Sequence, residues 1–185
     1  MTDLDGADGR TIGVAVSIPE PWGEQLRAHR ASFGDPAASS IPTHVTLLPP
    51  TPVRLDADPL VEQHLTAVAA TARPFDIHLR GTATFRPVSP VVFIQLVEGI
   101  GGCERLERAI RSGPLRRALQ FYYHPHVTVA HHLPDEALDR AFRELADFEC
   151  RFRVEEFHLY EHGGDGVWRP QRAFEFGSAA ARARA

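Results

Sequence analysis

The three-residue segment His-Val-Thr occurs twice in this sequence, at residues 44–46 and again at residues 126–128. Side chains alternate between the two faces of a β-strand, so the His and the Thr of each segment point the same way while the Val points into the core. Each segment therefore presents an imidazole beside a hydroxyl group. If the two halves of the chain pack about a pseudo-two-fold axis, these pairs face each other across a cleft.

Two histidines on either side of one phosphorus atom suit acid–base phosphoryl transfer. Imidazole titrates near neutral pH, so one ring can take a proton from water or a hydroxyl group while the other gives a proton to the leaving oxygen. His44 and His126 are the candidate acid–base pair. Thr46 and Thr128 would hydrogen-bond the non-bridging oxygens as negative charge builds on them. We predict that this chemistry uses no metal and no other cofactor.

The elements that carry these motifs follow the same order in both halves of the chain. Hydrophobic runs, helical periodicity and Gly or Pro breaks predict strand, helix, motif strand, helix and strand in each half. In the first half these elements cover residues 11–18, 22–33, 41–48, 59–72 and 75–85, with Pro49-Pro50 ending the motif strand. In the second half they cover residues 90–97, 103–119 (with Gly113-Pro114 as a candidate interruption), 121–130, 134–148 and 151–160, and a last strand follows at 168–176. Both motifs thus fall on the second strand of a repeated unit.

This duplication predicts an α+β fold of two pseudo-symmetric lobes around a central cleft. A chain of 185 residues can form one domain with a sizeable core, or two small lobes that share an interface. We expect residues 11–177 to form one bilobal domain. Residues 1–10 and 178–185 are expected to be disordered tails.

The composition argues against several classes of partner. A net charge of −4 is poorly suited to long duplex nucleic acid, whose binding depends on neutralised phosphates. No apolar run reaches the length of a membrane span, and the polar start of the sequence has no apolar segment typical of a signal peptide. Cys103 and Cys150 are too few for a disulfide framework and are expected to be buried. We expect a cytoplasmic monomer without a membrane partner.

The paired His-x-Thr motifs, their placement in two lobes, and the first strand followed by Pro and a helix resemble the 2H phosphoesterase superfamily. The similarity is greatest to its bacterial 2′-5′ RNA ligase / cyclic phosphodiesterase branch, and it covers the chain from Thr11 to Phe176. It implies two α+β lobes with both motifs on the floor of the cleft. It also implies metal-independent hydrolysis or transesterification of a 2′,3′-cyclic phosphate or a 2′-5′ RNA linkage, with a small cyclic nucleotide or an RNA terminus as substrate.

The resemblance also implies roles for the motif residues. It places His44, Thr46, His126 and Thr128 at the catalytic positions. His44 would be the general acid toward the leaving oxygen and His126 the general base on water, although the pseudo-symmetry also allows the reverse. The chain departs from the pattern at His131, where members of the RNA ligase branch often have an arginine. A neutral imidazole binds phosphate more weakly than a guanidinium group, so the substrate stays open.

Four further residues are candidate substrate contacts, three of them with a plainer alternative. His131 ends the second motif strand, where the family arginine is expected. His124 either shares the cleft face of His126 or lies at the frayed start of the strand before a proline. Tyr123 belongs to an aromatic run that either stacks on a base or packs in the core. Arg86 lies in the loop between the lobes and contacts either phosphate or solvent.

Two other functions are weighed against this one. The imidazoles of His124, His126 and His131 suggest a metal site, because imidazoles two residues apart on a strand can chelate an ion. The segment has no matching carboxylate, however, and a metal site would leave the first motif unexplained. The second alternative is a non-catalytic nucleotide or RNA-end binding module of the same fold. The missing arginine at position 131 favours it, and the intact motifs oppose it.

Overall fold

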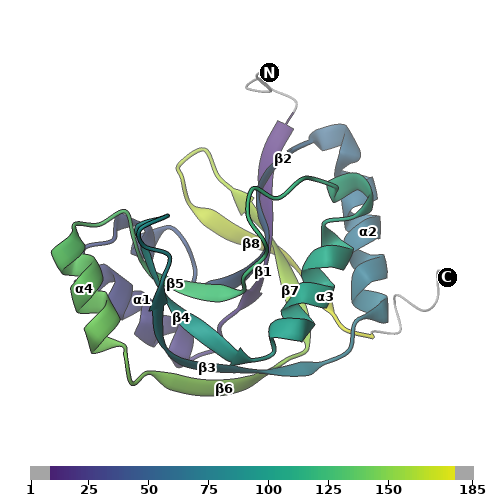
Figure 1. Ribbon diagram of the computed structural model, residues 1–185. Helices are drawn as coiled ribbons and strands as arrows, with labels where there is room; N and C mark the ends of the chain where they lie inside the picture. The colour runs from purple at the N-terminus through teal and green to yellow at the C-terminus, as the bar shows by residue number, and fades with distance from the viewer. Residues whose placement is uncertain (1–8, 178–185) are drawn as a thin grey trace.

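The structure, a computed structural model, describes residues 9–177 (Figure 1). Its strands form two four-stranded antiparallel sheets with the orders β2-β1-β7-β8 and β5-β4-β3-β6. The first sheet contains β1 (Gly9–Ser17), β2 (His44–Arg54), β7 (Glu156–His162) and β8 (Trp168–Glu175). The second sheet contains β3 (Phe75–Thr84), β4 (Val91–Glu98), β5 (His126–His131) and β6 (Glu149–Val154). The helices are α1 (Trp22–Ser32), α2 (Asp58–Thr71), α3 (Ile100–Ile110) and α4 (Asp135–Glu144).

The two sheets are built alike, which confirms the predicted α+β fold with two related halves. In each sheet the motif strand lies at one edge, β2 in the first sheet and β5 in the second. The next strand is the one that opens its half of the chain, β1 or β4. The third strand comes from the other half: β3 pairs with β4, and β7 pairs with β1. The two halves therefore exchange strands, a crossing that the order of elements along the chain does not reveal.

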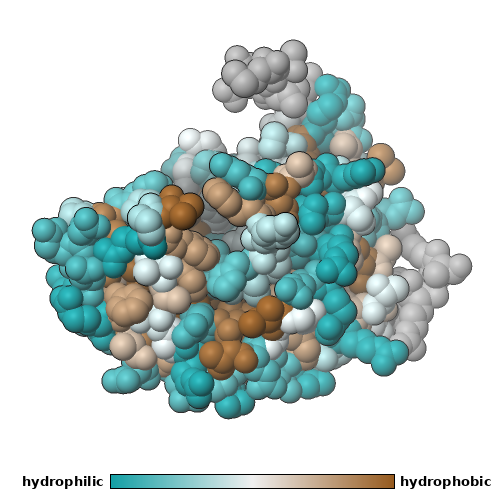
Figure 2. All heavy atoms as spheres, in the orientation of Figure 1, coloured by the Kyte–Doolittle hydropathy of each residue, from teal (hydrophilic) through white to brown (hydrophobic). Residues whose placement is uncertain are grey.

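The helices are exchanged in the same way. Helix α1 follows β1 of the first sheet but packs against β5 of the second, beside α4. Helix α3 follows β4 of the second sheet but packs against β2 of the first, beside α2. On the face shown in Figure 2, hydrophilic side chains cover α3 and α4 and apolar patches lie between them.

Each helix is held by one apolar stripe. Leu26, Leu65, Leu106 and Leu138, one from each helix, are all buried and belong to one cluster with the inner faces of both sheets. Complete burial of one such leucine contributes about 2 kcal/mol to stability. The helices thereby fix the two edge strands that carry the motifs.

Strand β2 is longer than the sequence predicted. We expected Pro49-Pro50 to end it, but β2 continues to Arg54 and passes through Pro49, Pro50 and Pro52. Prolines are tolerated because β2 is an edge strand, so a missing N–H group that faces away from β1 removes no ladder bond. The pairing of β2 with β1 is irregular on both sides of Val14, where the strand accommodates this stretch.

The two motif strands share a β-bulge directly after the threonine. One residue of the central strand is matched by two residues of the motif strand at this point, in both sheets. The pairs that define it are Thr46 with Ala15 and Leu48 with Val14 in the first sheet, and Thr128 with Phe93 and Ala130 with Val92 in the second. A bulge re-aims the side chains that follow it. The same β-bulge therefore occurs at the equivalent position in both halves.

Several predicted boundaries differ from the structure. The predicted helix at 103–119 ends at Ile110, before Gly113-Pro114, and the predicted strand at 121–130 begins only at His126, after Pro125. Proline lacks the N–H group that both elements need, which accounts for both differences. The predicted strand at 151–160 is divided into β6 and β7.

The ends of the described chain bear on the predicted tails. Gly9 and Arg10, which we expected to be disordered, begin β1, and Arg10 forms ion pairs with Asp58 and Glu161 at 3.1 and 2.8 Å. The remainder of the two predicted tails, 1–8 and 178–185, lies outside the described residues. Within residues 9–177, no helix combines the length and the apolar character needed to cross a membrane.

Candidate active site

A pocket of about 270 Å³ lies where the edge strands β2 and β5 meet. His44 and Thr46 of the first motif line it, together with Thr128 and His131 from β5. The remaining lining residues are Arg30 and a mostly apolar group consisting of Gly13, Val14, Ala15, Ile41, Pro42, Leu48, Pro50, Tyr160 and Trp168. The pocket therefore joins residues of both halves.

The ring of His44 is fixed by two hydrogen bonds. Its Nδ1–H group donates to the carbonyl oxygen of Pro42, 2.6 Å away. In the neutral ring the proton is thus on Nδ1, and the lone pair of Nε2 can accept a hydrogen bond from the hydroxyl group of Thr46 at 3.1 Å. The two polar groups of the first motif are therefore in direct contact.

His126 repeats this arrangement in the other half. Its Nδ1–H group donates to the carbonyl oxygen of His124, 2.7 Å away and again two residues earlier in the chain. A backbone acceptor at Nδ1 fixes the tautomer and leaves Nε2 as the basic nitrogen. Both histidines therefore expose the nitrogen that proton transfer requires, and they do so by the same local contact.

Burial keeps both rings neutral near pH 7. It lowers the pKa of His126 to about 4, despite the opposing effect of the hydrogen bond to His124, and the imidazoles of His124, His44 and His131 add to the decrease. Burial also lowers the pKa of His44, and the positive charge of Arg30 lowers it further. Bound phosphate would act in the opposite direction, because a nearby negative charge favours the protonated ring.

Two phenyl rings that we did not predict as site residues surround His126. The ring centroids of Phe85 and Phe93 each lie 5.0 Å from that of His126, with interplanar angles of 89° and 57°. Phe93 pairs with Thr128 across the β4–β5 ladder. The sequence shows Phe93 only as one residue of an apolar strand, so this contact depends on the strand register.

Arg30 is a second residue that we did not predict. It is only 6% exposed, yet it lines the pocket, and its Nε–H group donates to Oδ2 of Asp35 at 2.7 Å. Asp35 is buried too, and its Oδ1 accepts the N–H group of Ala37 at 2.9 Å. The spacing of five residues is not that of an ion pair within one helix, so no local pattern indicates this pair.

The predicted substrate contacts have different fates. His131 lines the pocket, because the bulge after Thr128 breaks the strict alternation that would place it on the opposite face from His126. His124 does not line it; its ring lies 5.6 Å from both Phe85 and Phe93 and is edge-on to both. His126 itself lies beside the pocket, close enough to His44 and His131 for their charges to affect its pKa.

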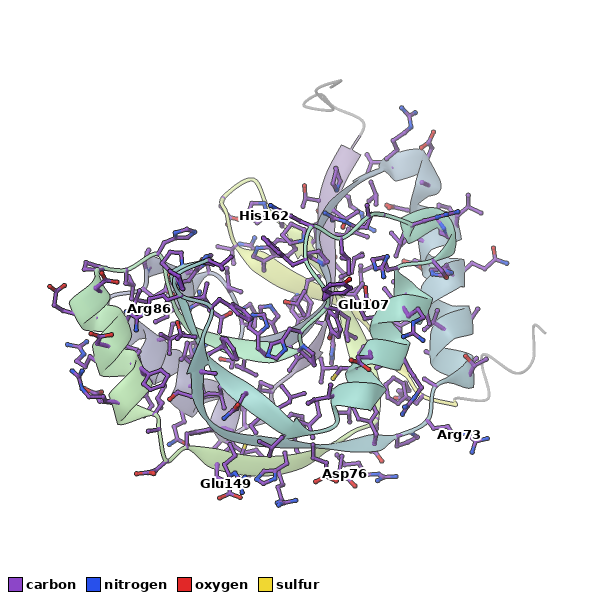
Figure 3. All side chains as sticks on the ribbon, viewed as in Figure 1. Arg73, Asp76, Arg86, Glu107, Glu149 and His162 are labelled. Carbon is purple, nitrogen blue, oxygen red and sulfur yellow. The ribbon has the colours of Figure 1, made fainter. Side chains whose placement is uncertain are left out.

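The other two candidates also lie outside the pocket lining. The hydroxyl group of Tyr123 donates to the carbonyl oxygen of Thr46 at 2.8 Å, so this side chain supports β2. Arg86 lies beside α4, where it pairs with Asp139 at 2.7 Å and with Asp135 at 3.4 Å (Figure 3). Among residues 9–177, no three His, Cys, Asp or Glu side chains are grouped as ligands for a metal ion, His124 and its neighbours included.

The two-sheet architecture with four helices is also the fold of several solved structures. The crystal structure of Escherichia coli LigT with 3′-AMP has a TM-score of 0.68 and 19% identity, and the match covers 92% of this chain and all of LigT. The crystal structure of TT0787 from Thermus thermophilus has a TM-score of 0.57 and 23% identity, covering 91% of this chain and 99% of the other.

Sequence comparison identifies the family. The profile described as the 2′-5′ RNA ligase superfamily matches residues 18–166, so the chain belongs to this superfamily of phosphoesterases. BH1439 of Halalkalibacterium halodurans is 26% identical to this chain over 167 residues. The match covers 89% of this chain and 96% of the relative, which is itself only provisionally named a phosphoesterase. A similarly named protein of Bacillus thuringiensis strain Al Hakam is 26% identical over 145 residues, or 77% of this chain and 84% of its own length. The resemblance inferred from the motifs is thereby confirmed.

Proposed function

We propose that the protein is a metal-independent phosphoesterase that uses its two His-x-Thr motifs to hydrolyse or transesterify a 2′,3′-cyclic phosphate or a 2′-5′ RNA linkage. One observation carries the proposal. His44 and His126 each donate Nδ1–H to the carbonyl two residues earlier, on edge strands that meet at one pocket. This is the orientation in which both Nε2 atoms are available for proton transfer.

His126 is the better candidate for the general base. Its ring lies against two phenyl rings and stays neutral down to about pH 4, the pKa that burial sets. In hydrolysis, its Nε2 takes a proton from water as the water oxygen forms a bond to phosphorus. The bond from phosphorus to one ribose oxygen breaks, and that oxygen must receive a proton. In transesterification a ribose hydroxyl group takes the place of water.

His44 is then the general acid. Bound phosphate raises its pKa, because the anion stabilises the imidazolium form against the effects of burial and of Arg30. Protonated Nε2 gives its proton to the leaving ribose oxygen. The hydroxyl groups of Thr46 and Thr128, which both line the pocket, donate to the non-bridging oxygens as charge builds on them. Since one chain supplies both motifs, we also propose that the protein acts as a monomer.

The test is turnover of 2′,3′-cyclic nucleotides and of a 2′-5′-linked dinucleotide by the wild type, His44→Ala and His126→Ala. Loss of a general acid or base is expected to lower kcat by about 10²- to 10⁴-fold. His29→Ala is the matched control, because His29 lies on α1 and contacts Phe33 rather than the pocket. Wild-type rates in either motif variant would sink the assignment.

The alternative is a binding module of the same fold that holds a nucleotide without turning it over. The observation in its favour is His131, whose pKa is lowered mainly by partial burial, so that it is uncharged where the family resemblance implies an arginine. Solved structures of LigT with 3′-AMP and with ATP show that this fold can hold nucleotides. Saturable binding of cyclic nucleotides with no product over the same panel would support this alternative.

A further inference from the structure

One side chain of the pocket wall, that of Arg30, is both charged and buried, and the stability of the fold does not by itself explain its presence. Arg30 and Asp35 are both nearly inaccessible, at 6% and 4% exposure. Taking a guanidinium and a carboxylate out of water costs several kcal/mol for each ion, and apolar residues of similar size often stabilise a protein equally well. A buried pair whose arginine lines a pocket is therefore a candidate for a functional rather than a stabilising role.

The pair is held rigidly at the end of α1. The N–H group of Asp35 donates to the carbonyl of Arg30 at 3.3 Å, and Gly34, at a φ of 87°, turns the chain back. A second hydrogen bond, from Nε of Arg30 to the carboxylate of Asp35, joins the same two residues through their side chains. Backbone and side chain thus fix the direction of the guanidinium group.

Only one edge of the guanidinium group is occupied. Within residues 9–177 the Nε–H group of Arg30 has a partner, and the two terminal nitrogens have none. No buried side-chain nitrogen or oxygen there lacks a partner, so these terminal nitrogens are reached by solvent. Because Arg30 lines the pocket and is otherwise covered, the pocket is where they are reached.

The position of this group relative to the motifs suggests its ligand. Arg30 shares the pocket with His44, Thr46, Thr128 and His131. Burial lowers the pKa of His44, and the charge of Arg30 lowers it further, as expected of a cation close to this ring. Partial burial and His132 lower the pKa of His131, while Asp35 raises it and Arg30 lowers it, so the pair acts on this ring as well. His131 occupies the position at which an arginine was expected, and it is uncharged near pH 7. Among the described residues that line the pocket, Arg30 alone carries a permanent positive charge.

We propose that Arg30 of α1, oriented by Asp35, supplies the guanidinium group that binds the substrate's phosphate, in place of an arginine at position 131. The proposal rests on the proposed function for the identity of the substrate, a phosphate ester. The two free N–H edges match two non-bridging oxygens of a phosphoryl group. The cation thus comes from α1, which packs against β5, instead of from β5 itself.

Inorganic phosphate is the probe, and its dissociation constant is measured by isothermal titration calorimetry. Arg30→Gln is expected to weaken phosphate binding about 10- to 100-fold, the loss typical of charge-assisted hydrogen bonds. Arg30→Lys keeps the charge without the fork, so intermediate affinity is expected. Arg27→Gln is the matched control, because Arg27 lies on the exposed face of the same helix and is expected to leave binding unchanged.

Arg30→Gln leaves Asp35 buried without its partner, so its folding is checked by thermal unfolding. The double variant Arg30→Gln/Asp35→Asn removes both charges and is expected to fold while showing the same loss of phosphate binding. Adding His131→Arg to the Arg30→Gln variant is expected to raise the affinity for phosphate severalfold above that of Arg30→Gln alone. If Arg30 had only a structural role, an arginine on β5 would not restore phosphate binding.

The outcomes separate the two proposals. If no substrate is turned over but phosphate binding depends on Arg30, the proposed function fails and the anion site stands. If cyclic nucleotides are hydrolysed while the folded Arg30 variants bind phosphate within twofold of the wild type, the anion site is overturned and the function stands. A wild type that binds no phosphate also overturns the anion site.

Discussion

The hydroxyl group of Tyr123 donates a hydrogen bond to the carbonyl oxygen of Thr46 at 2.8 Å. Tyr123 precedes the second motif and Thr46 belongs to the first, so this bond ties the segment that leads into β5 to strand β2. It explains why an aromatic residue at this position serves the site without lining the pocket. Burial raises the pKa of Tyr123 far above its usual value, so the hydroxyl group remains a donor at any physiological pH.

Tyr123→Phe is expected to remove this bond while keeping the ring. A buried carbonyl left without its partner costs about 1–3 kcal/mol, which corresponds to a decrease of several degrees in Tm for a chain of this size. We expect kcat to fall severalfold as Thr46 loses its fixed position. Calorimetric Tm and cyclic-nucleotide kinetics measure the two effects. An unchanged Tm would show that this bond does not stabilise the attachment of the segment before β5 to β2.

The threonines of the two motifs are expected to act on the transition state rather than on binding. Thr46→Val and Thr128→Val keep the shape of the side chain but remove the hydroxyl donor. The loss of such a donor typically lowers kcat by about 10²- to 10³-fold. Thr66→Val is the control, because the hydroxyl group of Thr66 bonds to the carbonyl of Glu62 on α2. A change confined to KM would contradict this role.

His126 is expected to make stability depend on pH. Its pKa is about 4 in the folded protein, mainly because it is buried, against about 6.5 in an unfolded chain. Between these values the unfolded state binds the extra proton, so stability is fully present above pH 6.5 and is lost as the pH falls toward 4. The loss is on the order of 3 kcal/mol.

The contribution of His126 is isolated by comparison with His126→Gln. Urea unfolding of both proteins at pH 7 and pH 4.5 gives the free energy of unfolding of each. The wild type is expected to lose more stability between the two pH values than the variant does. Equal losses would mean that His126 titrates normally in the folded protein.

The aromatic contacts of His126 predict a shift of the pH–rate profile. Phe85→Leu removes one of the two rings around His126, admits water and so raises its pKa from about 4 toward 6.5. As the general base must be neutral, the acid limb of kcat/KM is expected to move to higher pH. Phe142→Leu, at a residue that is 37% exposed on α4, is the control. An acid limb that stays in place would exclude Phe85 as a determinant of this pKa.

The sequence was sufficient to predict the motifs and the element that carries them. Each motif is local, because His and Thr two residues apart share a face of any strand, and the repeat placed both on equivalent strands. The exchange of β3 and β7 between the sheets was not predictable in this way. This exchange depends on which strands pair with each other. The residues of a short apolar strand such as β4 do not indicate which strand will be its neighbour.

The missed site residues are missed for the same physical reason. Arg30 resembles a surface arginine in sequence, and only the turn at Gly34 brings Asp35 back to bury it. Phe93 reaches His126 only through the register of β4 with β5. His131 lines the pocket only because the bulge after Thr128 interrupts the strict alternation of side chains along β5. Side chains placed by long-range pairing, rather than by local periodicity, account for these errors.

A chelator separates the proposed chemistry from a metal-dependent alternative. The proposed mechanism moves protons between His44, His126, water and the leaving oxygen, so it needs no ion as Lewis acid. Dialysis against EDTA is expected to leave kcat/KM on cyclic nucleotides unchanged, and added Zn²⁺ or Mn²⁺ is expected not to raise it. A loss of activity in EDTA that these ions restore would contradict the mechanism. It would point instead to the histidines at 124, 126 and 131, and His124→Ala would then reduce metal affinity as well as activity.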